Sequence, residues 1–208
     1  MTQPLALDHL LYATPDVDAT TAELEERFGV RFNPGGRHPN WGTRNRILPL
    51  GGSVYLEVIG PDEEQPEQAG NRILDVDRMQ GPAMRWWAVR TRRLVGAVEA
   101  LRAASLDPGS IIQGKRHRPD GTLLSWSMTD PRARSLDGIL PLLIDWEQTT
   151  HPGAEASGVT LRDLRIEHPD PARFAVAFDR FGLPEVARGE VAAIVATFDT
   201  PNGAITLR

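Results

Sequence analysis

The strongest constraint on the fold is a pattern that occurs three times along the chain. Three segments begin with a short strand-like run and continue into a run with helical periodicity: LALDHLLYATPDVDATTAELEERFGV (residues 5–30), AMRWWAVRTRRLVGAVEALRAASLD (83–107) and VTLRDLRIEHPDPARFAVAFDRFGLP (159–184). After each of the first two, a polar loop containing Gly, Arg and His leads into further strand-like runs. The repeated unit is therefore β-α-β-β-β, present twice in full and once in shortened form.

This repeat predicts an α+β protein built from paired βαβββ modules. One module leaves a face of its sheet uncovered, so we expect two modules to form a curved sheet cup around a shared cleft. The first module is predicted at residues 5–62 and the second at 82–148, with a linker at 63–81 whose acidic part is interpreted as solvated. A third, shortened module is predicted at 158–208, where it can extend the sheet or form a homodimer interface.

End signals support the predicted helices. Asp16 or Asp18 can accept hydrogen bonds from the free N–H groups of the first helical turn, and Gly29 suits a left-handed C-terminal position. In the third unit, Asp170 is expected to cap the helix and Pro171 to occupy its first position. The apolar stripes of all three helices are interpreted as core packing.

Composition narrows the class of partner and chemistry. The formal net charge of −5 argues against nucleic acid as a partner, and the absence of cysteine excludes disulfides and thiolate chemistry. No apolar run approaches the roughly 20 residues of a membrane span, and no secretory signal is visible, so we expect a cytoplasmic protein. The sequence carries no dinucleotide fingerprint or phosphate loop, so no nucleotide cofactor is expected.

One carboxylate, Glu57, lies in the middle of the apolar strand-like run SVYLEVI (53–59). Side chains alternate along a strand, so Tyr55, Glu57 and Ile59 are expected to face the cup while their neighbours pack under the helix. The same alternation in LDHLLYA (7–13) places His9 and Leu11 on the cup face. We therefore expect His9 and Glu57 to point into one concavity.

These segments resemble a known superfamily. LDHLLYATPDVDATTAELEERFGV followed by YLEVIG is similar to a vicinal oxygen chelate module, the unit of glyoxalase I, extradiol dioxygenases and bleomycin-resistance proteins. GRHPNWGTRNRILPL and LLIDW resemble the glyoxalase-like domain proteins in particular. The resemblance implies a cup that holds a divalent metal (Zn, Ni, Mn or Fe) between a His on the first strand and a Glu on the last, at the positions of His9 and Glu57.

The second module departs from this metal-binding pattern. Trp86 matches His9, and Leu143 is taken to match Glu57; neither side chain binds metal. Asp145, two residues beyond Leu143 and hence on the same face, is the candidate third oxygen ligand. The alternative is a hydrogen-bonded His9–Glu57 pair that acts as an acid–base dyad without metal.

Several residues are candidates for binding a substrate. Trp41, Arg44 and Asn45 lie where the second strand of the first module begins; alternation favours Asn45 on the cup face, while Arg44 can supply a charge-assisted donor. Trp86 and Trp126 are expected to give the cleft an apolar, stacking environment, although core packing is the alternative for both.

The leading hypothesis is a small-molecule lyase or isomerase of the glyoxalase-like type, with Glu57 and His9 as catalytic residues. A dioxygenase is less favoured because its iron site needs two His and one carboxylate, and only one His lies at a family position. His38 and His117, in the repeated loops, are interpreted as turn residues. The alternative function is a non-catalytic protein that binds or sequesters a small molecule without metal.

Overall fold

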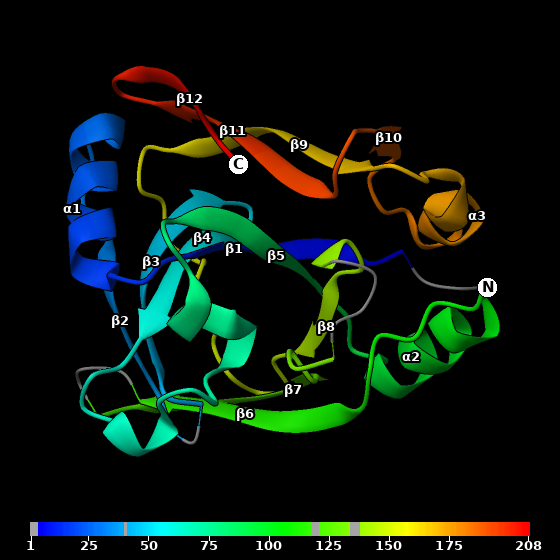
Figure 1. Cartoon of the computed structure of the whole chain (residues 1–208), viewed down its shortest axis with the longest axis horizontal. Coiled ribbons are helices and arrows are strands. Elements are labelled where there is room, and N and C mark those ends of the chain that lie inside the picture. Colours follow the sequence, from blue (N-terminus) through cyan, green and yellow to red (C-terminus); the bar gives the residue numbers. More distant parts are fainter. Residues whose placement is uncertain (1–3, 40, 118–120, 134–137) are drawn as a thin grey trace.

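A computed structural model of the chain describes residues 4–39, 41–117, 121–133 and 138–208. Eight strands form a closed, curved sheet with helices on its outside (Figure 1). The first half of this barrel comprises β1 (Ala6–Ala13), α1 (Val17–Phe28), β2 (Asn33–His38), β3 (Thr43–Gly51) and β4 (Val54–Pro61). The second half comprises β5 (Ala83–Arg90), α2 (Leu94–Ala103), β6 (Ile111–His117), β7 (Leu123–Thr129) and β8 (Leu142–Asp145). The α+β class and the paired modules around a cup are confirmed.

The two halves have the same strand order. In each, the first strand lies parallel to the fourth, and the sheet continues through the third to the second: β1-β4-β3-β2 and β5-β8-β7-β6. The halves join along antiparallel β1 and β5 and again where Arg37 of β2 pairs with His117 of β6. This closure brings the ends of β2 and β6, which are far apart in sequence, to one side of the barrel interior.

The third unit forms a separate sheet of four strands. It comprises β9 (Thr160–His168), α3 (Ala172–Phe181), β10 (Val186–Arg188), β11 (Ala193–Thr200) and β12 (Gly203–Leu207), in the order β10-β9-β11-β12. The five elements follow the repeat, but here the second strand, not the fourth, lies parallel to the first. Figure 1 shows this sheet, yellow to red, alongside the barrel near β1, β4 and β5. Apolar contacts join the two sheets, because Phe28 packs on Phe198 and Trp87 on Phe178.

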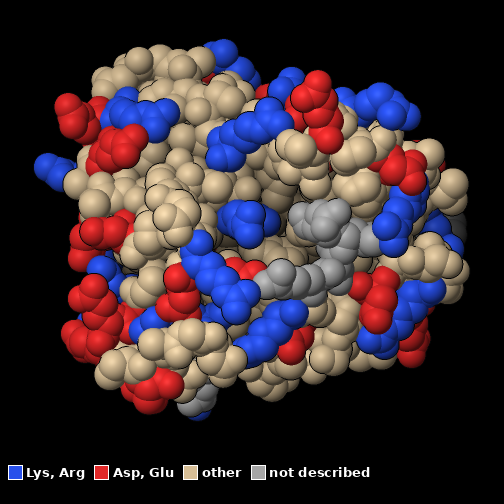
Figure 2. All heavy atoms as spheres, viewed as in Figure 1, with Lys and Arg blue, Asp and Glu red and all other residues tan. Residues whose placement is uncertain are grey.

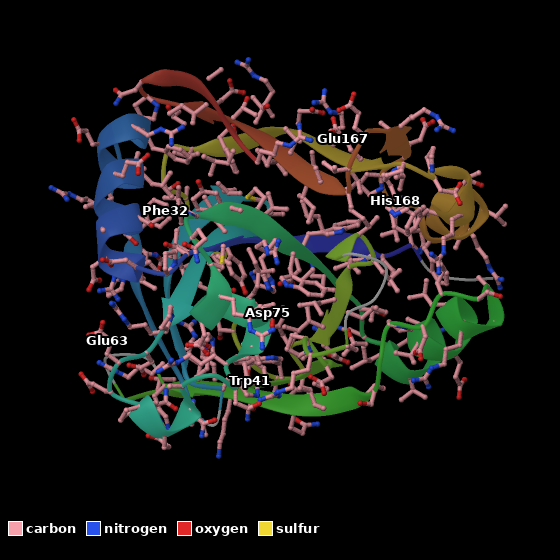
Figure 3. All side chains as sticks on the ribbon, in the orientation of Figure 1. Phe32, Trp41, Glu63, Asp75, Glu167 and His168 are labelled. Carbon is pink, nitrogen blue, oxygen red and sulfur yellow. The ribbon has the colours of Figure 1, made fainter. Side chains whose placement is uncertain are left out.

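The ends of α1 agree with the end signals in the sequence, but the start of α3 does not. The Asp16 side chain accepts a hydrogen bond from the backbone N–H of Ala19, and Gly29 ends α1 in the left-handed conformation with φ of 72°. The predicted Asp170 cap is wrong, because no side chain caps α3. The Asp170 backbone N–H instead donates to the ring of His168, which is labelled in Figure 3.

Buried side chains form two clusters, one on each face of the barrel sheet. The outer cluster packs the sheet against the helices and the third unit and includes Leu10, Leu56 and Phe178. The inner cluster fills the barrel and includes Leu11 and Trp41. Trp41 is labelled with other side chains of the molecule in Figure 3. Successive side chains of a strand point to opposite faces of the sheet, so the adjacent residues Leu10 and Leu11 pack in different clusters.

The predicted linker, 63–81, consists of two parts with different surroundings. Its first part is mostly exposed and contains η1 (Pro66–Gln68), but η2 (Ile73–Arg78) turns inward. Ile73, Leu74 and Val76 are buried in the inner cluster. The second part of the predicted linker therefore closes one side of the barrel interior.

No helix within the described ranges has both the length and the apolar character needed to cross a membrane. Acidic and basic side chains are interspersed over the face of the molecule shown in Figure 2.

Candidate functional site

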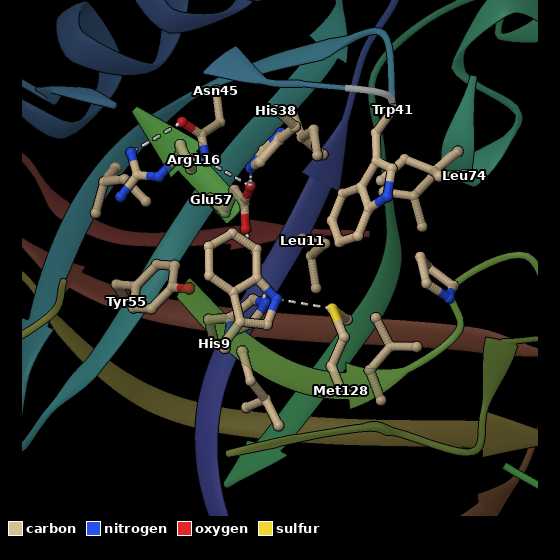
Figure 4. Close-up of a pocket in the computed structure, with 17 residues that line it drawn as sticks. His9, Leu11, His38, Trp41, Asn45, Tyr55, Glu57, Leu74, Arg116 and Met128 are labelled. Carbon is tan, nitrogen blue, oxygen red and sulfur yellow. Dashed lines mark hydrogen bonds and ion pairs between the residues drawn. The ribbon is translucent and has the colours of Figure 1, made fainter. Parts of the chain in front are cut away.

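A cavity of about 40 Å³ lies inside the barrel (Figure 4). Polar side chains line one part of it: His9, His38, Asn45, Tyr55, Glu57 and Arg116. Apolar side chains line the rest, among them Leu11, Trp41, Ile59, Trp126, Met128, Leu142 and Ile144. The alternation expected on β1 and β4 holds, because both strands direct every second side chain into this space. The structure therefore brings the two predicted catalytic residues together.

The Glu57 carboxylate is oriented by its neighbours on β3. Its Oε1 accepts a hydrogen bond of 2.6 Å from Asn45 Nδ2. The Asn45 amide is itself fixed, because its Oδ1 accepts from the Gly36 backbone N–H at 2.8 Å and from Arg116 Nη1 at 3.3 Å. Glu57 Oε2 is then left facing His9 Nε2 at 3.7 Å. Figure 4 shows this series of contacts across the cavity wall.

His9 is held in one orientation by a buried carboxylate and an aromatic ring. Its Nδ1 lies 2.6 Å from Asp8 Oδ1, and its ring stacks on Tyr55 with centroids 4.6 Å apart. An ionised Asp8 only accepts hydrogen bonds, so His9 Nδ1 carries a proton and donates it. In neutral His9 the Nε2 atom is then an acceptor. Nε2 of His9 and Oε2 of Glu57 are two basic atoms that face each other, and a proton donor between them would satisfy both.

Burial sets the protonation of two further cavity residues. Burial lowers the pKa of His38 to about 4, against the opposing effect of Glu57. His38 is therefore neutral near pH 7, with Nδ1 3.0 Å from Thr43 Oγ1 and Nε2 4.0 Å from Glu57 Oε1. Burial, and then the charges of Glu57 and Asp8, raise the pKa of Tyr55 well above its ordinary value, so its hydroxyl stays protonated.

We predict that His38 makes stability depend on pH. The unfolded chain protonates His38 near pH 6.5, whereas the folded chain resists protonation until about pH 4. Stability therefore rises with pH between these values, and this residue alone should reduce the free energy of unfolding by about 2 kcal/mol from pH 7 to pH 5.

Urea denaturation of the wild type and of His38→Gln at both pH values measures this effect as the difference in their pH dependence. His117→Gln is the matched control, because His117 is exposed. Equal pH dependence in the wild type and His38→Gln would show that the burial of this imidazole is not what limits its protonation.

Arg116 places a buried guanidinium at the polar end of the cavity. It lies on β6 with only 3% of its surface exposed, and it donates to Asn45 Oδ1. Sequence reasoning missed both Arg116 and His38, because each lies in a polar run near the end of a strand. The pairing of Arg37 with His117 at the β2–β6 junction could have signalled them, but that pairing is a tertiary feature. A permanent cation in an enclosed site can bind an anionic group or stabilise developing negative charge.

Comparison with known proteins identifies the family. A family model described as "Glyoxalase-like domain" matches residues 7–182. The chain belongs to the glyoxalase-like domain family. This membership confirms the resemblance to glyoxalase-like domain proteins that the sequence motifs indicated. No protein with a curated description matches the chain.

Solved structures share the glyoxalase-like fold at low sequence identity. A hypothetical protein from Staphylococcus aureus matches with a TM-score of 0.66 and 12% identity, over 91% of this chain and 88% of that one. Methylmalonyl-CoA epimerase from Mycobacterium tuberculosis matches with a TM-score of 0.43 and 17% identity, over 69% and 89%. Methylmalonyl-CoA epimerase in complex with methylmalonyl-CoA and ammonium gives 0.44 and 18%, over 72% and 100%. At these identities the likeness shows the fold alone.

The predicted substrate-binding residues divide into two groups in this glyoxalase-like barrel. Trp41, Asn45 and Trp126 line the cavity, and the two indoles meet edge to face with centroids 6.0 Å apart. Trp86 is buried in the same inner cluster but does not line the cavity. Arg44 points outward, as its alternation with Asn45 requires, and forms two hydrogen bonds of 2.9 Å with Asp18.

Asp145 is not brought to His9 and Glu57. The strand register pairs Leu11 with Glu57 and Ala88 with Leu142, so Leu142 is the counterpart of Glu57 in the second half. Our placement of this counterpart at Leu143 was one residue out, and a shift of one residue reverses the face. Leu143 packs in the outer cluster, and Asp145 borders a separate hollow on the outside of the barrel.

The donor set does not fit the divalent metal that the family resemblance implies. Glu57 Oε2 lies 3.7 Å from His9 Nε2 and Oε1 lies 4.0 Å from His38 Nε2, while Oε1 is already bonded to Asn45. Among the residues that the structure describes, no group of three or more His, Asp and Glu side chains is arranged to hold a metal ion.

Proposed function

We propose that this glyoxalase-like protein is an isomerase or lyase that moves a proton on a small carbonyl compound, with Glu57 and His9 as the acid–base pair. The observation that carries the proposal is that Glu57 Oε2 and His9 Nε2 face each other at 3.7 Å in the cavity inside the barrel. Two basic atoms converging on one point match the need of a reaction that removes a proton and returns it.

The side chains support the following steps. Glu57 Oε2 takes a proton from the carbon next to the substrate carbonyl, and the electrons of that C–H bond pass to the carbonyl oxygen. Arg116 stabilises the resulting enolate by its charge. In an isomerisation the enolate takes the proton back on the opposite face of the same carbon, and the carbonyl re-forms. In a lyase reaction the enolate electrons re-form the carbonyl, make a double bond to the next carbon and expel from it a leaving group, which takes up the proton. His9 can carry the proton between positions, because Asp8 stabilises the imidazolium that forms.

The shape of the cavity limits the substrate class. Arg116 at the polar end favours a compound that also bears a carboxylate or another anionic group. The aromatic and aliphatic wall, with Trp41 and Trp126, suits a short apolar portion. A volume of about 40 Å³ holds about three water molecules, so even a small substrate requires wall side chains to move apart.

Solvent exchange tests the proposal without knowledge of the natural substrate. Small 2-oxo and 3-oxo acids are incubated with the protein in D₂O, and proton NMR follows deuterium entry at the carbon next to the carbonyl. We expect the wild type to accelerate deuterium entry into at least one of these acids, and we expect Glu57→Gln to lose that acceleration. Exchange that is absent for the whole panel, or equal in both proteins, would refute the acid–base assignment.

The aromatic wall favours one alternative, a protein that binds a small molecule without turning it over. Trp41 and Trp126, which meet edge to face, line the cavity with aromatic surface that an aromatic ligand can contact. The same panel, extended with aromatic acids, distinguishes this function by tryptophan fluorescence. Quenching by a ligand that undergoes neither exchange nor conversion, and equal affinity in Glu57→Gln, would support binding alone.

Metal content is a separate prediction. Because no group of three His, Asp and Glu side chains among the described residues is arranged to hold a metal, we expect the purified protein to contain no more divalent metal per chain than a His9→Ala, Glu57→Ala double variant. Elemental analysis by mass spectrometry after dialysis measures this. Stoichiometric metal in the wild type alone, with a rise in melting temperature on adding that ion, would show that the side chains rearrange to bind it.

A further inference from the structure

The site is connected to the outside of the barrel through a buried carboxylate, Asp8. Asp8 has none of its surface exposed. Its Oδ1 accepts from His9 Nδ1 at 2.6 Å, while its Oδ2 lies 3.0 Å from His151 Nε2 and 3.1 Å from Trp146 Nε1. Burial acts to raise the pKa of Asp8, but the hydrogen bonds from His151 and His9 hold it well below its usual value. Asp8 therefore stays ionised and accepts from three rings at once.

The protonation of His151 can be assigned from its other ring nitrogen. The backbone N–H of Gly153 donates to His151 Nδ1 at 3.0 Å, so Nδ1 is an acceptor. In neutral His151 the proton then lies on Nε2 and is donated to Asp8 Oδ2. Both imidazoles thus donate to the same carboxylate from opposite sides. Because neither directs a lone pair at Asp8, this arrangement orients the rings and does not pass protons along a chain.

His151 lies outside the strands that build the cavity. It belongs to the segment between β8 and β9, and its side chain borders a second hollow of about 610 Å³ on the outside of the barrel. Its side chain is 14% exposed, whereas that of His9 is 5% exposed. The surroundings of His151 include charged groups from several elements: Asp8 on β1, Arg90 on β5, Arg92 and Arg93 before α2, and Asp145 and Glu147 at and after β8.

We propose that His151 is a positioning residue for the acid–base site: through Asp8 it holds His9 in the tautomer whose Nε2 lone pair faces Glu57. With Oδ2 bonded to His151 and Trp146, the carboxylate cannot turn away from His9, and Oδ1 remains directed at His9 Nδ1. The inference builds on the proposed acid–base function. It adds a residue that lies 142 positions along the chain from His9 and makes no direct contact with the substrate cavity.

The tautomer of His9 provides a test that does not depend on turnover. Nitrogen-15 NMR of the imidazole rings in the full-length protein distinguishes a protonated Nδ1 from a protonated Nε2, and single substitutions assign the five histidines. In the wild type we expect one tautomer at His9, with the proton on Nδ1. In His151→Phe, which fills a similar space without a donor, we expect loss of the single tautomer and signals averaged between the two forms.

Two further variants make the result specific. His151→Gln keeps an N–H donor for Asp8 and should restore the wild-type tautomer at His9. Trp146→Phe removes the other donor to Oδ2 and should have a smaller effect, because His151 remains. If His151→Phe fails to fold, the comparison of His151→Gln with His151→Leu replaces it.

The outcomes separate this inference from the proposed function. A single Nδ1-protonated tautomer in a folded His151→Phe or His151→Leu protein would overturn the positioning role, whatever the activity. A changed tautomer in a protein that catalyses no deuterium exchange would support the positioning role and count against the proposed reaction. With an active substrate, the rate at saturation should fall in His151→Phe and recover in His151→Gln, while KM changes little.

Discussion

Glu57→Gln is expected to slow proton exchange by about 100-fold or more while leaving the protein folded. General acid–base groups contribute roughly 10²- to 10⁴-fold to rate, and an amide cannot accept the substrate proton. The substituted side chain retains the shape of the glutamate, and its carbonyl can still accept the hydrogen bond from Asn45 Nδ2. The rate of deuterium entry at the substrate carbon measures the loss directly.

The same substitution should not destabilise the protein. In the wild type, Glu57 Oε2 and His9 Nε2 face each other at 3.7 Å, and the amide of the variant can present an N–H donor to the acceptor Nε2 of a neutral His9. We expect the free energy of unfolding to stay constant or to rise by about 1 kcal/mol. Glu63→Gln, at an exposed position, is the matched control for both measurements. A large loss of stability in Glu57→Gln would mean that the carboxylate is structural, and the opposition of two bases would then not indicate catalysis.

The alternation of side chains along the strands allowed the residues at the centre of the candidate site to be predicted. Glu57 is the one charged residue in its apolar strand, and the apolar residues on either side identify which face is the core face. The same alternation predicted that His9 faces the cup, and it favoured Asn45 rather than Arg44 as the cup-facing residue of its strand. These predictions needed no tertiary information beyond the pairing of two modules, because each strand has an inner and an outer face with different neighbours.

The second half could not be predicted as well, because its last strand carries no such contrast. In LLID the first three residues are all apolar, so the sequence does not show whether Leu142 or Leu143 faces inward. The error of one residue made Asp145 a candidate ligand. His38 and Arg116 face the cavity only because β2 and β6 meet when the barrel closes. The contact of His151 with Asp8 joins residues 143 positions apart, and no local pattern predicts it.

Asp8→Asn is expected to lower the free energy of unfolding by about 3 kcal/mol at pH 7. The substitution replaces a buried anion, which accepts from three rings, by an amide with one acceptor and one donor group. Whichever way the amide turns, its NH₂ group meets a ring N–H donor, and removing one partner from a buried charged pair typically costs roughly 3–5 kcal/mol. The ring tautomers can adjust, which places the expected loss at the lower end of that range.

The pH dependence of this loss follows from the lowered pKa of Asp8. A carboxyl group whose pKa is lower in the folded state stabilises the protein above its unfolded pKa, about 3.9, and loses this contribution as the pH falls further. The difference between wild type and Asp8→Asn should therefore be constant from pH 8 to about pH 5 and narrow below pH 4. Urea denaturation across this range measures it, with Asp145→Asn as the control. Asp145 accepts a bond from the nearby Glu147 backbone and is partly exposed, so its substitution should change stability by about 0.5 kcal/mol or less. Equal losses in the two variants would show that Asp8 is not the anchor that joins His9 to His151.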